Sequence, residues 1–445
     1  MNRYTLKISL LFLVTLSLLS GSAFAKQESI SQQLAGLSSL DLATAKRLAL
    51  EGSPTIKVAR ERVTQATYVV NQKKAAFLPQ VDAGASLTRK DTSANSESDT
   101  TSDTYATSLS ASLTLFDGFS RRYSLDSARH SKNAYAKALE EARHLLLLNV
   151  SKAFFTLQTA VENINIAESS RAYNARLLLE AEASRKAGAG SLSDVLSFKI
   201  EVNKALATLA AEKKNLAVAQ TALAVLMGSE NGRLPQGLKL APLSSTPKSS
   251  ESQESPEVLL KKALAGRPDF LQALATIEKA TSTTQVARSG YYPTVTLAGT
   301  VSGTNTGSAT LGSDDFDSSL ALKVNLNLFS GGQTRAQVAE AISAEREARQ
   351  TASQLKLTIT QEVYDALASL ASAKEQAALQ AETVAFTRRS RDLVEEEYRA
   401  GQSTTVKLNE AQNNLVSAKG NLVSAQIALL TARETLKKVI GEIDS

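Results

Sequence analysis

Cysteine and tryptophan are absent from this chain of 445 residues, and aromatic residues make up only 5% of it. The lack of cysteine excludes disulfides, thiolate metal sites and a lipid-modified N-terminal cysteine. The residues that dominate instead are Ala, Ser, Leu, Glu, Gln and Lys, a usage typical of long packed helices rather than of a thick globular core. At this length, the composition indicates an elongated molecule.

Proline is also scarce, with eight residues in the whole chain and none between Pro79 and Pro235 or after Pro293. Two long stretches, 119–187 and 333–400, contain neither proline nor glycine. At 1.5 Å per residue, each stretch can form a helix about 100 Å long. Helices of this length do not fit inside a globular domain, so we expect an extended helical part.

The one long apolar run lies at the N-terminus. Arg3 and Lys7 precede "LLFLVTLSLL", which is followed by the small-residue sequence "SAFA". This order is typical of a secretory signal peptide, and we expect cleavage after Ala25. A membrane anchor is the alternative, but the run is shorter than the roughly 20 residues that a spanning helix needs. Because no later stretch reaches that length, any membrane crossing must use strands.

Several kinds of chemical site are missing from the sequence. The formal charge of +6 is spread along the chain without a dense basic block, so nucleic-acid binding is not expected. His130 and His144 are the only histidines, and no carboxylate cluster joins them, which argues against a metal site. No glycine-rich phosphate loop is present. We therefore expect neither an enzyme nor a cofactor.

The feature that the chain does contain is a duplication. A shift of about 213 residues lays "LTLFDGFSRR" over "LNLFSGGQTR", "RKAGAGS" over "YRAGQST", and Pro54 and Pro79 over Pro268 and Pro293. Four aligned points at one spacing indicate two structural repeats. The resulting plan is a signal peptide at 1–25, a first repeat at 26–227, a Pro- and Ser-rich linker at 228–266, a second repeat at 267–441 and a tail at 442–445.

Each repeat has the same order of expected elements. A helix of about 22 residues after Pro54 or Pro268 precedes a strand pair, because apolar residues then alternate with small polar ones, as in "YATSLSASLTLF". The long helices follow, and an apolar seam with steps of four and three residues supports them. The expected strand pairs are 79–117 and 293–329, and the expected helices are 118–187, 191–227, 331–400 and 404–440. The seam consists of Leu146, Val150, Ala153, Leu157, Ala160, Ile164 and Ala167, and the shift carries it to Ile359, Val363, Ala366, Leu370, Ala373, Ala377 and Gln380.

Four strands cannot enclose a pore by themselves. Amphipathic strands of about ten residues match the thickness of a bilayer, yet an open sheet edge in hydrocarbon leaves unpaired amides. Two chains give eight strands with a filled interior, whereas three give twelve and a water-filled lumen. The Ser, Thr, Asn and Lys residues of the polar face favour the larger assembly, although the sequence does not count the subunits.

The duplicated layout, the "LFDG" and "LFSGG" corners, and the tips "AGAGSLSDVL" and "YRAGQSTTVKLNEAQ" resemble the TolC-like outer-membrane efflux proteins of Gram-negative bacteria. The resemblance covers about 40–441. It implies a homotrimer in which three chains share a twelve-stranded β-barrel in the outer membrane and a long α-helical barrel in the periplasm. An equatorial region would use 38–52 and 228–266, and a periplasmic adaptor would connect the tips to an inner-membrane ABC or proton-driven pump.

By this resemblance, Tyr398 at the second tip and Asp194 at the first form a hydrogen-bonded latch that keeps the periplasmic end closed. The alternative interpretation is an ordinary helix-end aromatic and an acid stabilised by its helix dipole. An arginine that is often present in the second tip is Ser403 here. An acidic residue of the narrowest aperture is replaced by Lys407, although Glu410 stays acidic, so we expect a weaker cation preference.

The resemblance also implies residues for adaptor contact and for the strand-to-helix corners. The adaptor would meet the tips at Gly188, Ser191, Leu192, Gly401, Thr404 and Thr405. The two glycines also suit helix C-caps, and both roles are compatible. The corners consist of Phe116, Gly118, Phe329, Gly331 and Gly332, with the two phenylalanines expected at the barrel rim.

The function that the sequence predicts is a passive exit channel in the outer membrane, serving a tripartite efflux pump or a type I secretion system. The alternative is a periplasmic coiled-coil scaffold or adhesin-like stalk without a pore. The cargo cannot be inferred from the chain, because in such systems selectivity resides mostly in the pump.

Overall fold

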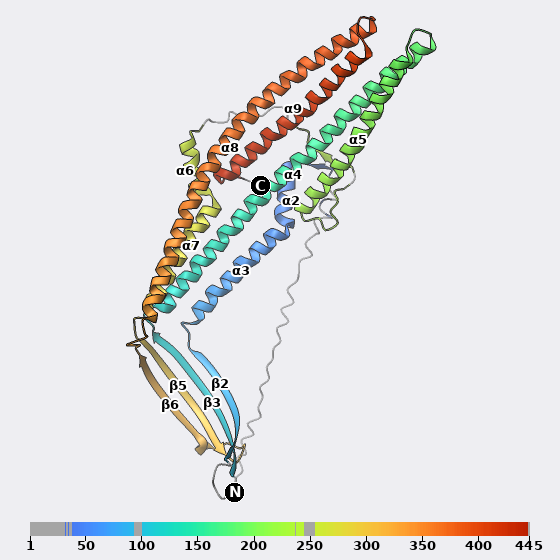
Figure 1. Ribbon diagram of the computed structural model, residues 1–445. Coiled ribbons are helices and arrows are strands. Elements are labelled where there is room, and N and C mark those ends of the chain that lie inside the picture. The colour runs from blue at the N-terminus through green and yellow to red at the C-terminus, as the bar shows by residue number, and fades with distance from the viewer. Residues whose placement is uncertain are drawn as a thin grey trace.

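The computed structural model describes Gln32, Leu34 and residues 38–92, 100–235, 237–243 and 254–443. The predicted signal peptide and its cleavage site lie outside the described residues. The molecule is elongated, with a four-stranded sheet at one end, a layer of helices in the middle and two helical hairpins at the other end (Figure 1). The expected architecture of long helices plus membrane-type strands is therefore confirmed.

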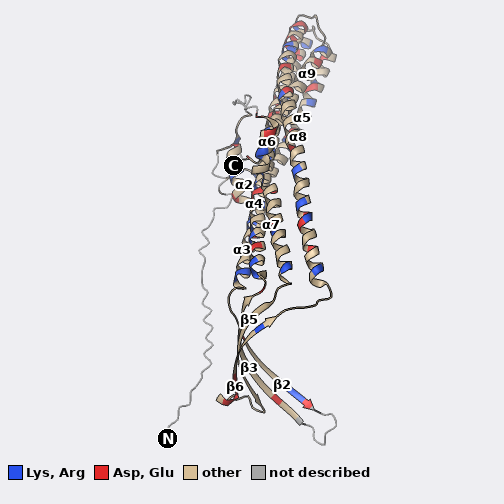
Figure 2. Cartoon of the chain, turned by 90° about the vertical axis from the view of Figure 1, so that its left-hand side faces the viewer, with Lys and Arg blue, Asp and Glu red and all other residues tan. Residues whose placement is uncertain are grey.

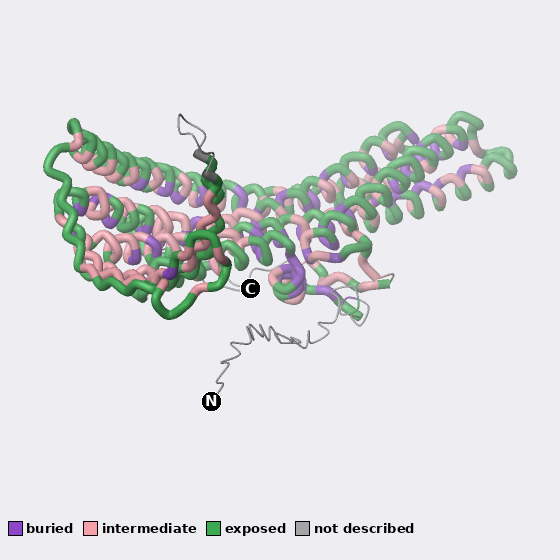
Figure 3. The backbone as a smooth tube through the Cα atoms, turned by 90° about the horizontal axis from the view of Figure 1, so that it is seen from below, coloured by how far each residue is buried: buried purple, intermediate pink, exposed green. Residues whose placement is uncertain are grey.

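Two very long helices run through both helical parts of the molecule. They are α4, Ser120–Lys186, and α8, Gln333–Arg399, each of 67 residues. Because neither contains glycine or proline, nothing interrupts their hydrogen-bond ladders. Of the seven predicted seam positions in α4, Leu146, Val150, Leu157, Ala160 and Ala167 are buried, and Ile359, Val363, Ala366 and Ala373 are buried in α8. Figure 3 shows buried positions recurring along the helices in this way.

Shorter helices pack along each long one. Near the sheet, α3 (Pro54–Ala75) lies against α4, and α7 (Pro268–Ser289) lies between α4 and α8. Each begins with proline, whose missing N–H has no partner in a first turn anyway. Towards the tips, α5 (Leu192–Leu226) pairs with α4, and α9 (Thr405–Ile440) pairs with α8. By length and hydropathy α9 is the one described helix that passes the test for a membrane span, which is weak evidence because it packs along α8 and α4.

The sheet consists of four antiparallel strands in the order β2-β3-β5-β6. Their bounds are Gln80–Thr92, Thr100–Phe116, Thr294–Thr306 and Phe316–Asn325. The register places Val81, Leu109, Leu297, Val301 and Leu322 on one face, because Leu109 is opposite Val301 and Leu297 is opposite Leu322. Ser and Thr side chains occupy the other face, and few charged residues lie on the strands (Figure 2).

One strand is shorter than expected. The second strand pair was predicted to reach Phe329, but β6 ends at Asn325, and Leu328 and Phe329 are 88% and 87% exposed. The reason is that Asn325 lies opposite Thr294, the first residue of β5, so the chain beyond it has no neighbouring strand in the described structure. A strand without a partner cannot form its ladder.

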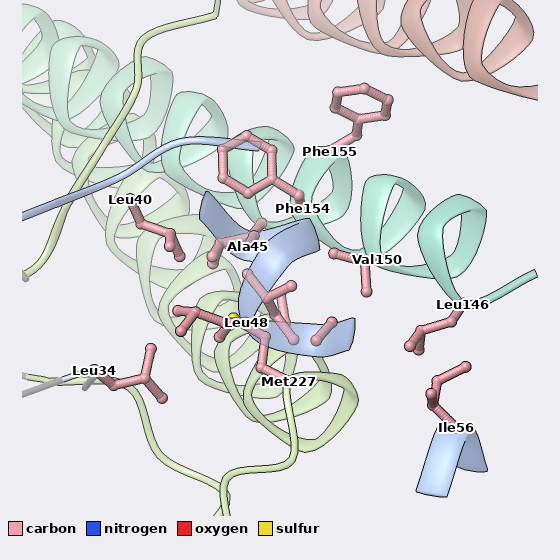
Figure 4. Close-up of a cluster of buried hydrophobic side chains, with 14 residues drawn as sticks. Leu34, Leu40, Ala45, Leu48, Ile56, Leu146, Val150, Phe154, Phe155 and Met227 are labelled. Atoms are coloured by element: carbon pink, nitrogen blue, oxygen red, sulfur yellow. The ribbon is translucent and has the colours of Figure 1, made fainter. Parts of the chain in front are cut away.

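The best-packed core lies at the middle of the molecule. There α2 (Leu42–Gly52) fits between α4 and α5, and its Ala45 and Leu48 face Val150 of α4 and Met227 at the end of α5 (Figure 4). The short strands β1 (Ser39–Leu40) and β4 (Lys239–Leu240) pair in parallel beside it. The counterpart of α2 in the second repeat is α6, Pro256–Gly266, which packs on α8 and α9. A single helical turn, η1 (Ser313–Asp315), precedes β6.

Candidate functional site at the helical tips

The two tips have the same local geometry. After α4 and α8, Gly188 and Gly401 adopt left-handed conformations with φ of 76° and 74°, and a Cβ at either position would meet nothing within 4 Å. Each second helix is then capped by a side-chain oxygen: Ser191 accepts from the Ser193 amide at 3.0 Å, and Thr404 accepts from the Lys407 amide at 3.3 Å. The glycine and capping signals therefore account for both turns.

The residues predicted for adaptor contact do not all share one environment. Gly188, Ser191, Leu192, Gly401 and Thr404 are exposed at the tips. Thr405, by contrast, is only 7% exposed, and its hydroxyl donates a hydrogen bond to the Asp194 carboxylate. This contact joins α9 to α5, and thus the second hairpin to the first.

The predicted latch pair is arranged differently from the expectation. The Tyr398 ring packs edge-to-face on Phe198, with centroids 6.1 Å apart, in an apolar cluster of α4, α5, α8 and α9. Within the described part of the chain, no hydrogen bond joins the Tyr398 hydroxyl to Asp194, whose carboxylate is engaged by Thr405. Both residues thus lie between the hairpins, each with a different partner.

The Thr405–Asp194 contact begins a polar ladder between α5 and α9. The Asn409 amide donates to the Ser197 hydroxyl at 3.0 Å, and the Asn413 amide donates to the Glu201 carboxylate at 3.4 Å. The donors on α9 are four residues apart, so they lie on one helix face. These residues were not predicted from the sequence, although their regular spacing of four residues on both helices is a local pattern that could have indicated them.

A second polar connection joins α4 to α8 through Glu395, whose side chain is 14% exposed. Its carboxylate accepts hydrogen bonds from the Tyr173 hydroxyl at 2.9 Å and from Arg176 at 2.8 Å, and Arg399 approaches it to 3.0 Å. The Arg391 guanidinium stacks over the Tyr173 ring at 4.7 Å. This cluster was not predicted from the sequence, because its members belong to helices more than 200 residues apart.

Charge and burial alter the acidities in this cluster. Burial and the hydrogen bond to Glu395 raise the pKa of Tyr173 to about 12. Burial alone would raise the pKa of Glu395, but the bonds from Arg176 and Tyr173 outweigh it and hold that pKa below its usual value. Glu395 is therefore ionised at neutral pH, and the cluster is a charge-assisted link between the hairpins.

The two predicted aperture residues, Lys407 and Glu410, both lie on the first turns of α9 and are exposed. They are one helical turn apart and therefore share a face. Among the described residues, neither side chain takes part in an ion pair. Their charges are thus exposed to solvent and not neutralised by another described residue.

At the opposite end, the strand-to-helix corners hold two left-handed residues each. In the first corner these are Gly118 and Phe119, with φ of 63° and 66°, and in the second they are Gly331 and Gly332, with φ of 61° and 88°. Gly118 also lies where a Cβ would be 2.7 Å from Tyr292. Backbone conformation thus favours glycine at the predicted corners, and the close approach of Tyr292 adds a steric reason at Gly118.

Similarity to known proteins agrees with this arrangement. The family description "outer membrane efflux protein" matches residues 46–229 and 259–442, one match for each repeat. The chain belongs to the outer membrane efflux protein family. This is a family of transport proteins and not of enzymes, and the similarity to TolC-like channels expected from the tips and corners is confirmed.

The relatives and solved structures support the same conclusion. The outer membrane efflux protein BepC of Brucella suis biovar 1 (strain 1330) is 25% identical over 416 residues, covering 93% of this chain and 85% of BepC. A structure of CusC superposes with a TM-score of 0.80 at 20% identity over 91% of this chain and 93% of CusC. The structure of the open state of the Neisseria gonorrhoeae MtrE channel superposes with a TM-score of 0.78 at 21% identity, covering 93% of this chain and 92% of MtrE. These structures establish the fold of an outer-membrane channel.

Proposed function

We propose that three copies of this chain form a passive exit channel in the outer membrane of a Gram-negative bacterium. The observation that carries the proposal is the sheet, which has an apolar face, a polar face and two edges, β2 and β6, without partners in the described structure. In hydrocarbon such edges must pair, and three copies of four strands close a barrel of twelve with room for a wet lumen. The exposed apolar residues of the β6 edge would then face lipid.

The helical part of the same assembly would form the periplasmic conduit. Helices α3, α4, α7 and α8 of each copy would line up around one axis, and their many alanines allow close approach. The chain would reach this compartment through its signal peptide, cleaved after Ala25. A coiled-coil scaffold without a pore is not supported, because membership of the efflux protein family covers both repeats.

The tips would carry the gate. In a trimer, the links from Thr405 to Asp194 and from Glu395 to α4 would be present three times and would hold the hairpins of each copy together. Each charge-assisted hydrogen bond contributes roughly 1.5 to 3 kcal/mol, so a partner opens the channel only by binding the open state correspondingly better. Tyr398 would support the gate by packing and, in other states, through Asp194.

The partners would be a periplasmic adaptor at the exposed tip residues and an inner-membrane pump. Energy must come from that pump, since the chain contains no nucleotide-binding loop. The names of relatives indicate several cargoes for those proteins: cations for CusC, toluene for TtgI of Pseudomonas putida and pyoverdine for OpmQ of Pseudomonas aeruginosa. For this chain we propose an efflux or secretion role without choosing among them.

The experiment has two parts. Mature protein is extracted from outer membranes in detergent, and its mass is measured by light scattering. It is then reconstituted in planar bilayers and its conductance is recorded. We expect trimers and a small conductance that rises when Thr405→Val and Glu395→Gln remove the two links. A monomer that washes off with salt and gives no conductance would refute the channel.

A further inference from the structure

A small cavity lies between α4, α8 and α9, on the side of the Glu395 cluster away from the tips. It has a volume of about 200 Å³. Its polar lining comes from three helices and contains no carboxylate: Ser169, Ser170, Tyr173, Arg391, Gln412 and Lys419. Ser170 and Gln412 are buried, being 8% and 5% exposed. The cavity is therefore lined by polar groups of three helices, two of them cationic, and the neighbouring Glu395 carboxylate contacts its Tyr173 and Arg391 from the side of the tips.

The two cations of this cavity differ in their counter-charge: Arg391 has the Asp392 carboxylate at 2.8 Å and the Glu395 carboxylate at 3.9 Å, whereas Lys419 has none among the described residues. Lys419 has neither a hydrogen bond nor an ion pair among the residues that the structure describes. Burial and the nearby charges of Arg388 and Arg391 lower the pKa of its ammonium group. The Arg391 Nε is buried without a partner, while its other nitrogens approach Asp392 at 2.8 Å and the Gln412 Oε1 at 3.5 Å. An unpaired buried donor costs free energy that a bound acceptor would recover.

We propose that this cavity binds a small oxyanion of the sulfate or phosphate class. Such an anion accepts several hydrogen bonds at once, and a guanidinium, an ammonium group, two serine hydroxyls and an amide line this cavity. Since one water occupies about 30 Å³ of liquid, the cavity has room for the anion and some water. The proposal does not depend on the channel function.

The bound anion would connect parts of the chain that otherwise meet through few contacts. Ser170 and Tyr173 belong to the first hairpin, and Arg391 and Lys419 belong to the second. Their shared ligand would add a bridge next to the Glu395 link and hold the hairpins in the arrangement described here. Stability of this arrangement would then depend on the anion present.

The test is calorimetric titration of sodium sulfate into the detergent-solubilised full-length assembly, in sodium chloride of matched ionic strength. We expect saturable binding of a single sulfate per chain. Lys419→Gln should weaken it by about tenfold or more, equivalent to about 1.4 kcal/mol. Lys356→Gln removes the same charge from an exposed position on α8 and should leave the affinity unchanged.

Thermal unfolding gives a second readout, in which Lys419→Gln should have opposite effects on stability without and with sulfate. Without sulfate, Lys419→Gln should raise the melting temperature, because the substitution relieves the repulsion between Lys419 and Arg391. With sulfate, the wild-type protein should gain stability, and the Lys419→Gln variant should not. Ser170→Ala, a small change, should weaken sulfate binding without that repulsion effect. The proposal is overturned if wild-type protein shows no saturable binding, or if Lys419→Gln and Lys356→Gln bind sulfate equally.

Discussion

The two repeats fold alike but stabilise the same corner differently. Gly332 adopts the left-handed conformation in the second repeat at no steric cost, whereas its counterpart Phe119 adopts it with a side chain. The Phe119 ring compensates by packing edge-to-face on Phe116, with centroids 5.6 Å apart. Phe329, the counterpart of Phe116, is 87% exposed. The first corner therefore packs part of its aromatic surface within the chain, with Phe119 51% exposed, whereas Phe329 of the second corner is almost fully exposed.

A similar difference separates the two elbows, which are the bends at Ser53 and Arg267 that precede α3 and α7. Ser53 and Arg267 occupy equivalent buried positions, 3% and 2% exposed. Arg267 pairs with Asp269 at 2.7 Å and with Glu362. Burial alone would raise the pKa of Asp269, but these bonds hold it below its usual value. The duplicated backbone thus tolerates either a small hydroxyl or a buried ion-pair network.

Close backbone contacts, in contrast, are the same in both repeats. Gly228 follows α5 and touches Gly52 at the end of α2, and Gly441 follows α9 and touches Gly266 at the end of α6. A Cβ on Gly228 would lie 2.5 Å from the Gly52 carbonyl oxygen, and one on Gly441 would lie 2.8 Å from the Gly266 carbonyl carbon. The comparison shows that backbone packing constrains both repeats equally, whereas charge is free to differ.

The largest effect should come from the elbow that carries charge. Arg267→Ala leaves Asp269 and Glu362 without their cation, and breaking such a pair costs about 3 kcal/mol. Ser53→Ala in the other repeat should cost less than about 1 kcal/mol. Urea unfolding of detergent-solubilised protein, followed by circular dichroism, measures both. Equal losses would show that the elbows are energetically equivalent.

The second largest effect on stability should come from the close glycine contacts that both repeats share, Gly228 with Gly52 and Gly441 with Gly266. Gly228→Ala combines a left-handed conformation with a backbone clash, and we expect a loss of about 2 kcal/mol. Gly237→Ala is the matched control, since its φ is 82° but a Cβ would meet nothing within 4 Å. It should lose only about 1 kcal/mol. The same unfolding assay decides, and indistinguishable losses would mean that the close contact is unimportant.

Acid should weaken the link that Glu395 of α8 makes between the two hairpins. The pKa of Glu395 is lowered from 4.5 in the folded state, so its stabilising contribution is present above pH 4.5 and is lost as the pH falls further. The groups facing it are Tyr173, Arg176, Arg391 and Arg399.

Glu395→Gln should remove this dependence and cost about 1.5 kcal/mol at neutral pH. Spin-label distances between the hairpins, measured from pH 7 to about pH 3, test both statements. Glu182 is the equivalent residue of the first repeat and has no ion pair in the described structure, so Glu182→Gln is the control. An acid response that persists in Glu395→Gln contradicts the assignment.

The corners should differ by a smaller amount. Gly332→Ala introduces a side chain into the left-handed region and should cost about 1 kcal/mol. Phe119→Gly removes that strain but also the ring contact with Phe116, so its net effect should be close to zero. Melting temperatures in detergent are sufficient for the comparison. A large loss for Phe119→Gly would indicate that the ring dominates.

The smallest effect on stability is expected at the tips, where Lys407 is the counterpart of Asp194 in the first repeat. Lys407→Glu changes an exposed residue and should alter stability by less than about 0.5 kcal/mol. Because the resemblance to TolC-like channels places Lys407 at the aperture, the reversal potential in a KCl gradient should move towards cation preference. The exposed Lys356→Glu provides the control, and identical potentials for both variants would place Lys407 away from the ion path.

Much of the fold was predictable because its signals are local. The seam through Leu146 and Val150 follows from helix periodicity, and the strand faces follow from alternation. The turns at the two tips were predicted from Gly188 and Gly401, and both glycines have a positive φ in the structure. The predicted end of β6 was wrong by four residues. Apolar and polar residues alternate as far as Phe329, but strand hydrogen bonds also need a neighbouring strand, which is missing beyond Asn325 in the described structure.

The candidate site was predictable only in its location. Asp194 was expected to pair with Tyr398, but its hydroxyl donor is Thr405, and Glu395 was not expected at all. These partners come from helices whose relative rotation and tilt no local pattern determines. A rotation of one helix by a fraction of a turn exchanges one polar neighbour for another.

The sequence by itself determined the duplication, the lengths of the helices, the polarity of the strand faces and the glycines of the turns, since each depends on residues close together in the chain. The tertiary structure decided where β6 ends, which side chains connect the hairpins and which cations share the cavity beside Lys419. Those features depend on contacts between segments about 200 residues apart, and such contacts exist only when the helices have packed.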